Sequence, residues 1–409
     1  MRKHQRYLPV RDAAGKLLPH FVAVANGDCD RAAVRAGNEA VLRARYEDAA
    51  FFWRPDLQTK PEIFRGALDK LAFEEKLGSM AQRADRIAAI AVALGRTVPE
   101  ADPQTLSRAA ELAKFDLATH MVVELTSLAG TMAREYARRS GESAAVAQAL
   151  FEMELPRSAG DAMPGSVPGA VLALADRLDL LVGLFVVGAN PTGSSDPFGL
   201  RRAAVGVVSL LRTMRELRPV TLDIGLAAAG EALLAQGIEV PAAKLGEARE
   251  FVVRRYEQQL LDAGTEHDLI AAVLPLAVAP AAADATLAEL AGLIERDEFT
   301  ELVGAIQRVQ RIVPAGTPSQ YDASRLTEQA ELALHEAFVK IKGDNQDLAT
   351  FAAVAGQLVV PIATFFDAVL VMADDPQLRA ARLGLLAAIK EWAGSVLDWQ
   401  AISLGARRD

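Results

Sequence analysis

Arg201 and Arg202 are two neighbouring cations at a position where a helix is expected to begin. Asp196 can cap free backbone N–H groups and Pro197 suits the first helical position, so the sequence predicts a helix from this point with an apolar face along residues 198–214. Two cations beside the positive end of a helix dipole are locally unfavourable. We therefore expect an anion nearby, either a phosphate group or a carboxylate such as that of Asp196.

The sequence contains no pattern typical of a nucleotide site or a catalytic metal site. Gly15 and Lys16 lack the upstream glycine and the following Ser or Thr of a phosphate-binding loop, and no dinucleotide glycine fingerprint occurs. CxxC, HExxH and GxSxG patterns do not occur either. The single cysteine, Cys29, excludes an intramolecular disulfide framework, is expected to be a small apolar filler, and favours a reducing cytoplasm. We assign no catalytic residue, metal ligand or cofactor to this chain.

The composition is that of a folded, helix-rich protein. The chain has 409 residues, of which 51% are hydrophobic and 24% charged, enough for two or three domains with their own cores. The net charge of −9 argues against non-specific coating of nucleic acid, although local basic patches remain compatible with it. No apolar signal region and no uninterrupted apolar span of membrane length are apparent, so we expect a soluble chain without a membrane partner.

Residues 7–24 have the only clear β pattern, a hairpin around the turn-prone RDAAGK. A hairpin alone is marginal in water, so we expect it to complete a larger N-terminal region or a sheet on another chain. After Asp30 the period is helical, and we expect helices over residues 63–77, 79–94, 103–114, 117–140, 142–154, 223–274 and 286–404, with breaks at VPAGTPSQYDAS and KGDNQD. The Ala-rich run between Pro275 and Pro280 and just beyond is expected to be a linker or interdomain turn.

Several long motifs carry a family resemblance. LPRSAGDAMP, ALADRLDLLVGLF and NPTGSSDPFGLRRAA, preceded by KHQRYLPV, VRAGNEAVLRARYEDAAFF and FEEKLGSM, resemble the β subunit of the bacterial two-subunit glycyl-tRNA synthetase. The resemblance implies an aminoacyl-tRNA synthetase subunit, part of a glycine-tRNA ligase in protein biosynthesis, that binds tRNA(Gly). It also implies an α subunit as partner in a heterotetramer, with glycine, ATP and Mg bound by that subunit. The family has a further N-terminal body before KHQRY.

Residues 67–217 resemble the HD-type phosphohydrolase fold, in which His, a His-Asp pair and a distant Asp hold a divalent ion. Asp176 stands at the position of the last Asp, but VVELTSLAG occupies the place of the His-Asp pair, and His120 lies one turn upstream without a neighbouring Asp. His267-Asp268 comes after the block, in the wrong order. An HD-type metal-dependent phosphohydrolase is the alternative function. Because the other metal ligands of that fold are missing, we expect Asp176 and Asp179 to be structural hydrogen-bonding residues.

The segment FFDAVLVMADDPQLRAARLGLLAAI resembles the helical, DALR-like anticodon-binding domain shared by arginyl-tRNA synthetase and the glycyl β subunit. An arginyl-tRNA synthetase fragment would explain only this segment. Helical spacing places Arg308 and Arg311 on one face and Arg379 and Arg382 on another. The resemblance implies that these arginines could contact tRNA phosphates or stack on unpaired anticodon bases, and an ordinary helix ion pair is at least as good an interpretation for any one of them.

The expected fold class is mainly α. We expect the end of a preceding α/β body domain in residues 1–65, an HD-like helical domain without metal ligands in 66–217, a helical linker in 218–284 and the anticodon-binding domain in 285–409. The candidate tRNA-binding residues are Arg201, Arg202, Arg308, Arg311, Arg379 and Arg382.

Overall fold

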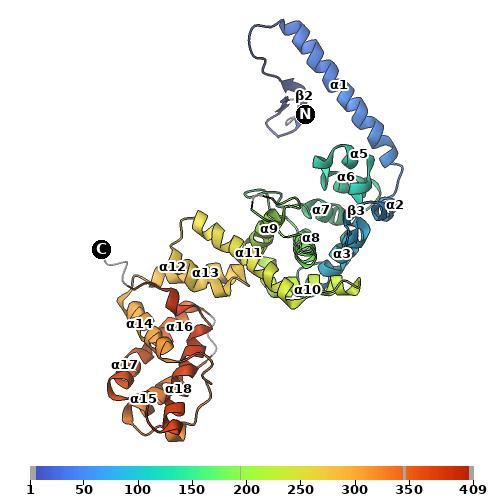
Figure 1. Ribbon diagram of the computed structural model, residues 1–409. Helices are drawn as coiled ribbons and strands as arrows, with labels where there is room; N and C mark the ends of the chain where they lie inside the picture. The colour runs from blue at the N-terminus through green and yellow to red at the C-terminus, as the bar shows by residue number, and fades with distance from the viewer. Residues whose placement is uncertain (1–5, 194, 344–346, 405–409) are drawn as a thin grey trace. The chain divides into compact units, whose positions relative to one another are not determined.

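The computed structural model describes residues 6–193, 195–343 and 347–404 (Figure 1). Within these ranges the chain is mainly α-helical with an N-terminal hairpin, as the sequence predicted, and it has a second short antiparallel strand pair that the sequence did not predict. It divides into two compact units, residues 1–59 and 60–409.

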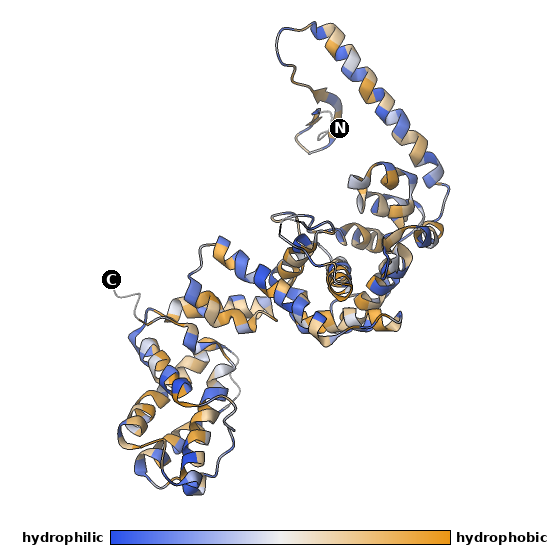
Figure 2. Cartoon of the chain, viewed as in Figure 1, coloured by the Kyte–Doolittle hydropathy of each residue, from blue (hydrophilic) through white to orange (hydrophobic). Residues whose placement is uncertain are grey.

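The first unit is a hairpin followed by one long helix. Strand β1 (Leu8–Arg11) pairs with β2 (Leu17–Val22), and Asp30 caps helix α1 (Arg31–Asp56) by accepting from the backbone N–H groups of the second and third residues after it. Tyr7 packs against Phe21, with ring centroids 4.9 Å apart, and its hydroxyl donates to Asn38 of α1 at 3.0 Å. Figure 2 shows hydrophobic residues spread along α1. The predicted hairpin and helix are confirmed.

The second unit begins with helices packed around α8 (Val167–Val186). The elements of this central body are α2 (Pro61–Ala67), β3 (Ala72–Glu74), β4 (Gly78–Ser79), α3 (Met80–Gly95), α4 (Pro103–Glu111), α5 (His120–Glu124), α6 (Thr131–Arg139), α7 (Ala144–Glu152), α8, α9 (Leu200–Thr213), α10 (Leu222–Ala235) and α11 (Ala242–Asp262). Helices α3, α7, α9, α10 and α11 all pack on α8, which is buried along most of its length and hydrophobic in Figure 2. A helix that is apolar on all sides needs neighbours on all sides, and α8 has them.

Three expected helix boundaries in this body are wrong. The helix expected over 63–77 ends early, because its second half forms the β3–β4 hairpin, in which Gly78 has a φ of 80°. The helix expected over 117–140 is broken, since Gly130 has a φ of 76° and precedes α6. Helix α9 begins at Leu200 after the left-handed Gly199 (φ 71°), so Pro197 is not its first residue.

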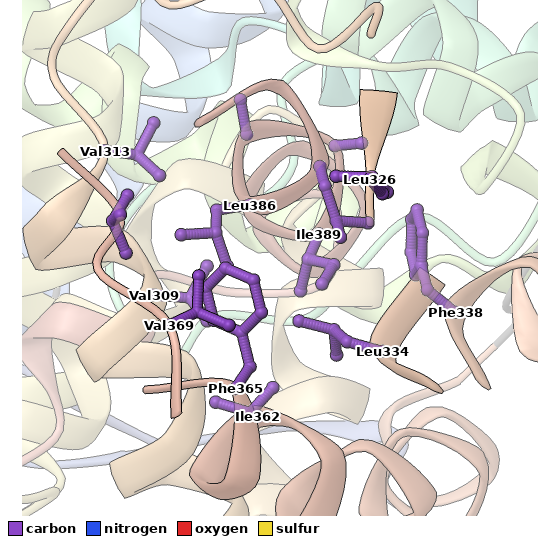
Figure 3. Packing of buried hydrophobic residues seen from close by; sticks show 14 of the residues in the cluster. Val309, Val313, Leu326, Leu334, Phe338, Ile362, Phe365, Val369, Leu386 and Ile389 are labelled. Atoms are coloured by element: carbon purple, nitrogen blue, oxygen red, sulfur yellow. The ribbon is translucent and has the colours of Figure 1, made fainter. Parts of the chain in front are cut away.

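The last helices form the C-terminal body. They are α12 (His267–Val273), α13 (Pro280–Leu293), α14 (Asp297–Ile312), α15 (Gln329–Ile341), α16 (Leu348–Ala355), α17 (Val359–Ala368) and α18 (Pro376–Gly394). Figure 3 shows one of its two clusters, where side chains of α14, α15, α17 and α18 meet around Phe365. The second cluster gathers around Phe351 and Trp399. Most of the Ala-rich run expected as a linker is the start of α13 and the expectation is wrong, because Pro280 is accommodated at the first helical position.

One segment, Leu348–Ala368, is long and apolar enough by length and composition to cross a membrane. The sequence had suggested no such span. The segment is interrupted by a 3-10 turn at Gly356–Leu358, and Phe351, Ile362 and Phe365 are buried in the two clusters of the C-terminal body. Part of its apolar surface is thus used in packing between helices, whereas Val360 is 72% exposed.

The four predicted domains remain a prediction. Helix α10, inside the region expected to be a linker, packs on α3 and α8. The Leu222 backbone N–H also donates to the carbonyl of Val278 at 2.7 Å. Residues 218–284 therefore contribute packing surface to the second unit.

We expect Gly384→Ala to destabilise the C-terminal body even though alanine favours helix. A Cβ at Gly384 would lie 2.7 Å from Cβ of Tyr321 and 3.1 Å from the Gln320 carbonyl oxygen, atoms that cannot rotate away. The overpacking should lower the free energy of unfolding by roughly 1–3 kcal/mol. Gly246→Ala in α11 is the matched control, because its Cβ would meet nothing within 4 Å, and it should be neutral or stabilising by about 0.5–1 kcal/mol in the same urea titration. Equal effects of the two substitutions would contradict this account.

Candidate functional site

The first candidate site is a buried ion-pair network on one face of α8. Asp176 and Asp179 are one helical turn apart and face α3, whose Arg83 and Arg86 have the same spacing. Arg83 binds both carboxylates, with Nη2 2.9 Å from Oδ1 of Asp176 and Nε 3.2 Å from Oδ2 of Asp179. Arg86 is 1% exposed, and its Nε lies 2.6 Å from Oδ1 of the fully buried Asp179. These pairs fasten α3 to α8.

Lys114 completes the network from the loop after α4. Its ammonium lies 2.8 Å from Oδ2 of Asp176 and 2.8 Å from Oε1 of Glu154, and the residue is 6% exposed. Burial by itself lowers the pKa of this ammonium, but the charges of Asp176 and Glu154 outweigh burial and raise the pKa above its ordinary value. Likewise, burial raises the pKa of Asp176, and the charges of Lys114 and Arg83 more than offset it and hold that pKa at about 2. Both groups are therefore charged at neutral pH.

Asp116 is a second buried carboxyl beside this network. It is 2% exposed, and its Oδ2 accepts the backbone N–H of Gly130 at 2.7 Å. Burial, followed by the negative charge of Glu154, raises the pKa of Asp116 to about 6. The carboxyl of Asp116 therefore changes charge at a pH closer to neutral than an ordinary aspartate does.

The donor set around Asp176 does not fit a metal centre. Both of its carboxylate oxygens are occupied by protein cations, Lys114 and Arg83, and cations repel a metal ion. Across the residues that the structure describes, no group of three or more His, Cys, Asp or Glu side chains is placed to hold a metal. His120 is exposed at the start of α5, and Asp268 accepts the backbone N–H of Ser403 in the C-terminal body. The arrangement can stabilise charge and fasten helices together, and it contains no hydroxyl or thiol nucleophile.

The carboxylate of Asp196 lies at the start of the helix that carries Arg201 and Arg202. Asp196 accepts the backbone N–H groups of Leu200 at 2.7 Å and of Arg201 at 3.0 Å, so it caps α9 from four residues upstream. The Arg201 guanidinium donates to the carbonyl of Gly193 at 2.5 Å, and Arg202 is exposed. The capping role expected for Asp196 is confirmed.

The C-terminal body brings Arg308 and Arg311 to its surface on α14. The guanidinium of Arg308 lies over the ring of Phe366, 4.5 Å from its centroid, and 3.8 Å from a carboxylate oxygen of Asp367. Arg311 is exposed and its Nε donates to the carbonyl of Gln307 at 3.2 Å. Both cations remain accessible to an external anion.

Arg379 and Arg382 on α18 have different surroundings. Arg379 is half-buried, donates to the carbonyl of Ala373 at 3.2 Å, and lines a surface cavity of about 310 Å³ together with Thr317, Pro318, Gln320, Pro376, Ala380 and Leu383. Arg382 is 5% exposed, binds the fully buried Glu331 of α15, and donates to the carbonyl of Leu370 at 2.7 Å. The placement of Arg382 favours the ion-pair interpretation of this residue.

The structural hydrogen-bonding role expected for Asp176 and Asp179 is confirmed, but their partners Arg83, Arg86 and Lys114 were not predicted. A signal was present, because Arg83 and Arg86 are two charged residues three apart in an apolar helix, and Asp176 and Asp179 repeat that spacing in another. Such residues cannot be buried singly at acceptable cost, which suggests mutual pairing. Lys114 offered no comparable signal, because its left-handed backbone (φ 63°) and its burial depend on the packed structure.

We expect Asp116→Asn to flatten the pH dependence of stability between about pH 4 and 7. The folded state keeps the Asp116 proton up to a pKa of about 6, whereas the unfolded chain releases it near the ordinary value of 3.8. The folded state therefore binds the extra proton in this window, and the parent's free energy of unfolding should fall as pH rises through it, by up to roughly 3 kcal/mol. Urea titrations at several pH values measure the slope. The exposed Asp374→Asn is the control and should keep the parent's slope; the same slope in both variants would remove the assignment.

Comparison with known proteins identifies the family. A family model described as glycyl-tRNA synthetase beta subunit matches residues 1–275. The chain is 38% identical to glycine-tRNA ligase, chloroplastic/mitochondrial 2 of Arabidopsis thaliana over 97% of this chain and 38% of that protein. It is 37% identical to the glycine-tRNA ligase beta subunit of Syntrophotalea carbinolica, and 38% identical to that of Desulforamulus reducens, in each case over 98% of this chain and 59% of the relative.

The chain thus spans about 60% of the length of these bacterial relatives. The resemblance inferred from LPRSAGDAMP, ALADRLDLLVGLF and NPTGSSDPFGLRRAA is confirmed, because the match extends over nearly the whole chain. The chain belongs to the glycyl-tRNA synthetase beta subunit family.

Proposed function

We propose that this chain is a tRNA-binding part of a glycine-tRNA ligase, supporting the ATP-dependent attachment of glycine to tRNA(Gly). The observation that carries this proposal is family membership, with 36–39% identity to glycine-tRNA ligase beta subunits over 94–99% of the chain. The catalytic core, with its glycine, ATP and Mg, is proposed to lie on an α subunit that assembles with the β subunit as a heterotetramer. A cytoplasmic location is supported by the single cysteine.

Residues 285–404, which lie within the C-terminal body, are the proposed contact with the anticodon stem and loop. Arg308 is half exposed, and its guanidinium lies 4.5 Å from the centroid of the Phe366 ring. An exposed guanidinium beside an aromatic ring is suited to stack on an unpaired base, and Arg311, one turn further along α14, is suited to a phosphate. Because the net charge is −9, binding would depend on such local positive positions.

The cavity beside Arg379 extends this proposed contact to α18. Its volume of about 310 Å³ is at the small end of the range for ligand pockets. Gln320 and Thr317 supply hydrogen-bonding groups at its wall, and the Arg379 guanidinium supplies a cation. These groups support a contact with one nucleotide of the loop. Arg382 is proposed to hold α18 against α15, and Arg201 and Arg202 remain candidates for a second, phosphate-type contact.

The alternative function, an HD-type metal-dependent phosphohydrolase, receives no support from the site. The carboxylate of Asp176 is bound by Lys114 and Arg83, so the one residue at a family ligand position is already paired. We therefore propose a structural role for the central body.

We expect Arg308→Ala, Arg311→Ala and Arg379→Ala to weaken tRNA(Gly) binding in two distinguishable ways. A phosphate contact releases counterions, so its loss should make the slope of log affinity against log salt shallower by roughly one unit. A stacked arginine should instead leave the slope nearly unchanged and reduce discrimination against an anticodon-swapped tRNA. Filter binding at several salt concentrations with both tRNAs measures the two quantities.

Arg254→Ala is the matched control, because Arg254 is an exposed helix arginine that pairs with Glu250 four residues earlier in α11. It should match the parent in affinity, slope and discrimination. Arg382→Met should lower thermal stability, since it leaves the buried Glu331 unpaired. If the three surface variants bind as the control does, the proposed anticodon contact is wrong.

We also expect the purified chain to form no glycyl-adenylate by itself, because it carries no nucleotide-binding motif. Glycine-dependent exchange of pyrophosphate into ATP should stay at background with this chain alone. Glycine-dependent exchange by this chain without an α subunit would contradict the division of labour proposed above. An active two-subunit glycyl-tRNA synthetase serves as the positive control for the assay.

A further inference from the structure

We propose that the Lys114 ammonium holds two carboxylates of the central body together, in the way that a bound metal cation would hold them. It holds Asp176 of α8 and Glu154 of the loop after α7 together, at 2.8 Å from each. These two carboxylates are 62 and 40 residues from Lys114 along the chain, so their attraction for a shared cation joins three separate segments. Without a cation between them they would repel each other in a region shielded from water.

The backbone is built to bring this cation into place. Lys114 adopts a left-handed conformation with φ 63°, which costs a residue with a Cβ free energy and is retained only where the surroundings enforce it. Helix α4 ends at Glu111, and the left-handed residue redirects the chain so that the lysine side chain enters the interior. A lysine whose only task was to solubilise the surface would not be 6% exposed.

Gly130 provides a second, independent indication that the site is adapted to its carboxylates. A Cβ on this residue would lie 2.7 Å from Cγ of Glu154, so only glycine lets that side chain pass toward Lys114. The same residue donates its backbone N–H to Asp116 at 2.7 Å. One glycine with φ 76° therefore gives room to one carboxylate and a hydrogen bond to another.

Charged groups of several packed segments face Lys114. Asp176 and Glu154 attract the ammonium, and Arg83 of α3 repels it; Asp116 is a nearby carboxyl whose pKa is raised by burial. Removal of the ammonium would leave Glu154 without its cation, while Asp176 would keep only Arg83. Lys114 is thus a positioning residue, which acts by fixing the segments that carry the two carboxylates.

Truncation to alanine removes three methylene groups and the ammonium, a fragment with the size and charge of propylammonium. The proposal predicts that Lys114→Ala in the full chain lowers the melting temperature by roughly 3–7 °C, because two partly buried carboxylates lose their shared cation. It predicts that propylammonium chloride raises the melting temperature of this variant by several degrees more than sodium chloride of equal ionic strength does. The parent should show no difference between the two salts.

Two further variants separate charge from packing. Lys114→Met keeps the aliphatic volume and should still be destabilised, with no response to propylammonium because the space is filled. Adding Glu154→Gln to Lys114→Met should restore part of the loss, since the side chain left unpaired is then neutral. Lys244→Ala is the surface control, because Lys244 pairs with Glu247 three residues later in an exposed position, and should shift the melting temperature by less than about 2 °C.

Three results would overturn the proposal. The first is a Lys114→Met variant as stable as the parent, which would show that only aliphatic packing matters at this position. The second is an equal response of Lys114→Ala and the parent to propylammonium. The third is a further loss of stability on adding Glu154→Gln to Lys114→Met, a comparison that remains informative even if Lys114→Ala does not fold.

Discussion

The pairing of buried charge around α8 is the constraint on which the central body depends. Helix α8 is apolar on nearly every side, yet it carries Asp176 and Asp179 into the interior, where an unpaired carboxylate would cost several kcal/mol. Arg83 and Arg86 meet these carboxylates from α3, and Lys114 meets Asp176 from the loop after α4. Each pair can form only in one register of the helices, so the network specifies which faces come together in addition to the apolar packing that stabilises them.

The C-terminal body also contains a buried carboxylate that is paired with a cation and joins two helices. Glu331 is fully buried, accepts the backbone N–H groups of Thr327 at 2.7 Å and Glu328 at 2.9 Å, and binds Arg382. This one carboxylate therefore joins the start of α15 to α18. The apolar cluster around Phe365 fills the space between the helices, and the surface arginines of α14 are presented on a framework whose buried Glu331 is paired with Arg382. Because the buried pair does not involve Arg308 and Arg311, these two arginines can bind an external partner without loss of the pairing that stabilises the fold.

The proposed function uses the two bodies differently. In the central body the carboxylates of Asp176 and Asp179 hold helices together, and each of them is paired with protein cations. In the C-terminal body several cations remain accessible, one supported by an aromatic ring and one beside a cavity. A family member with a net charge of −9 would therefore recognise RNA through a few placed contacts, with little contribution from a general positive field.

The fold class, the hairpin, most of the helices and the family could all be predicted from the amino-acid sequence. These follow from local signals: period, caps such as Asp30 and Asp196, and motifs that are contiguous in the chain. Local signals also misled, as at Pro197, where a favourable first helical residue lies three positions before the observed helix start. Only the tertiary structure decided that Arg83 pairs with Asp176, 93 residues away, and that Arg382 pairs with Glu331, 51 residues away. Arg308 and Arg382 both lie on regular helices, and helical periodicity does not distinguish them. The packing of distant elements decides that Arg382 is buried and paired and that Arg308 is exposed.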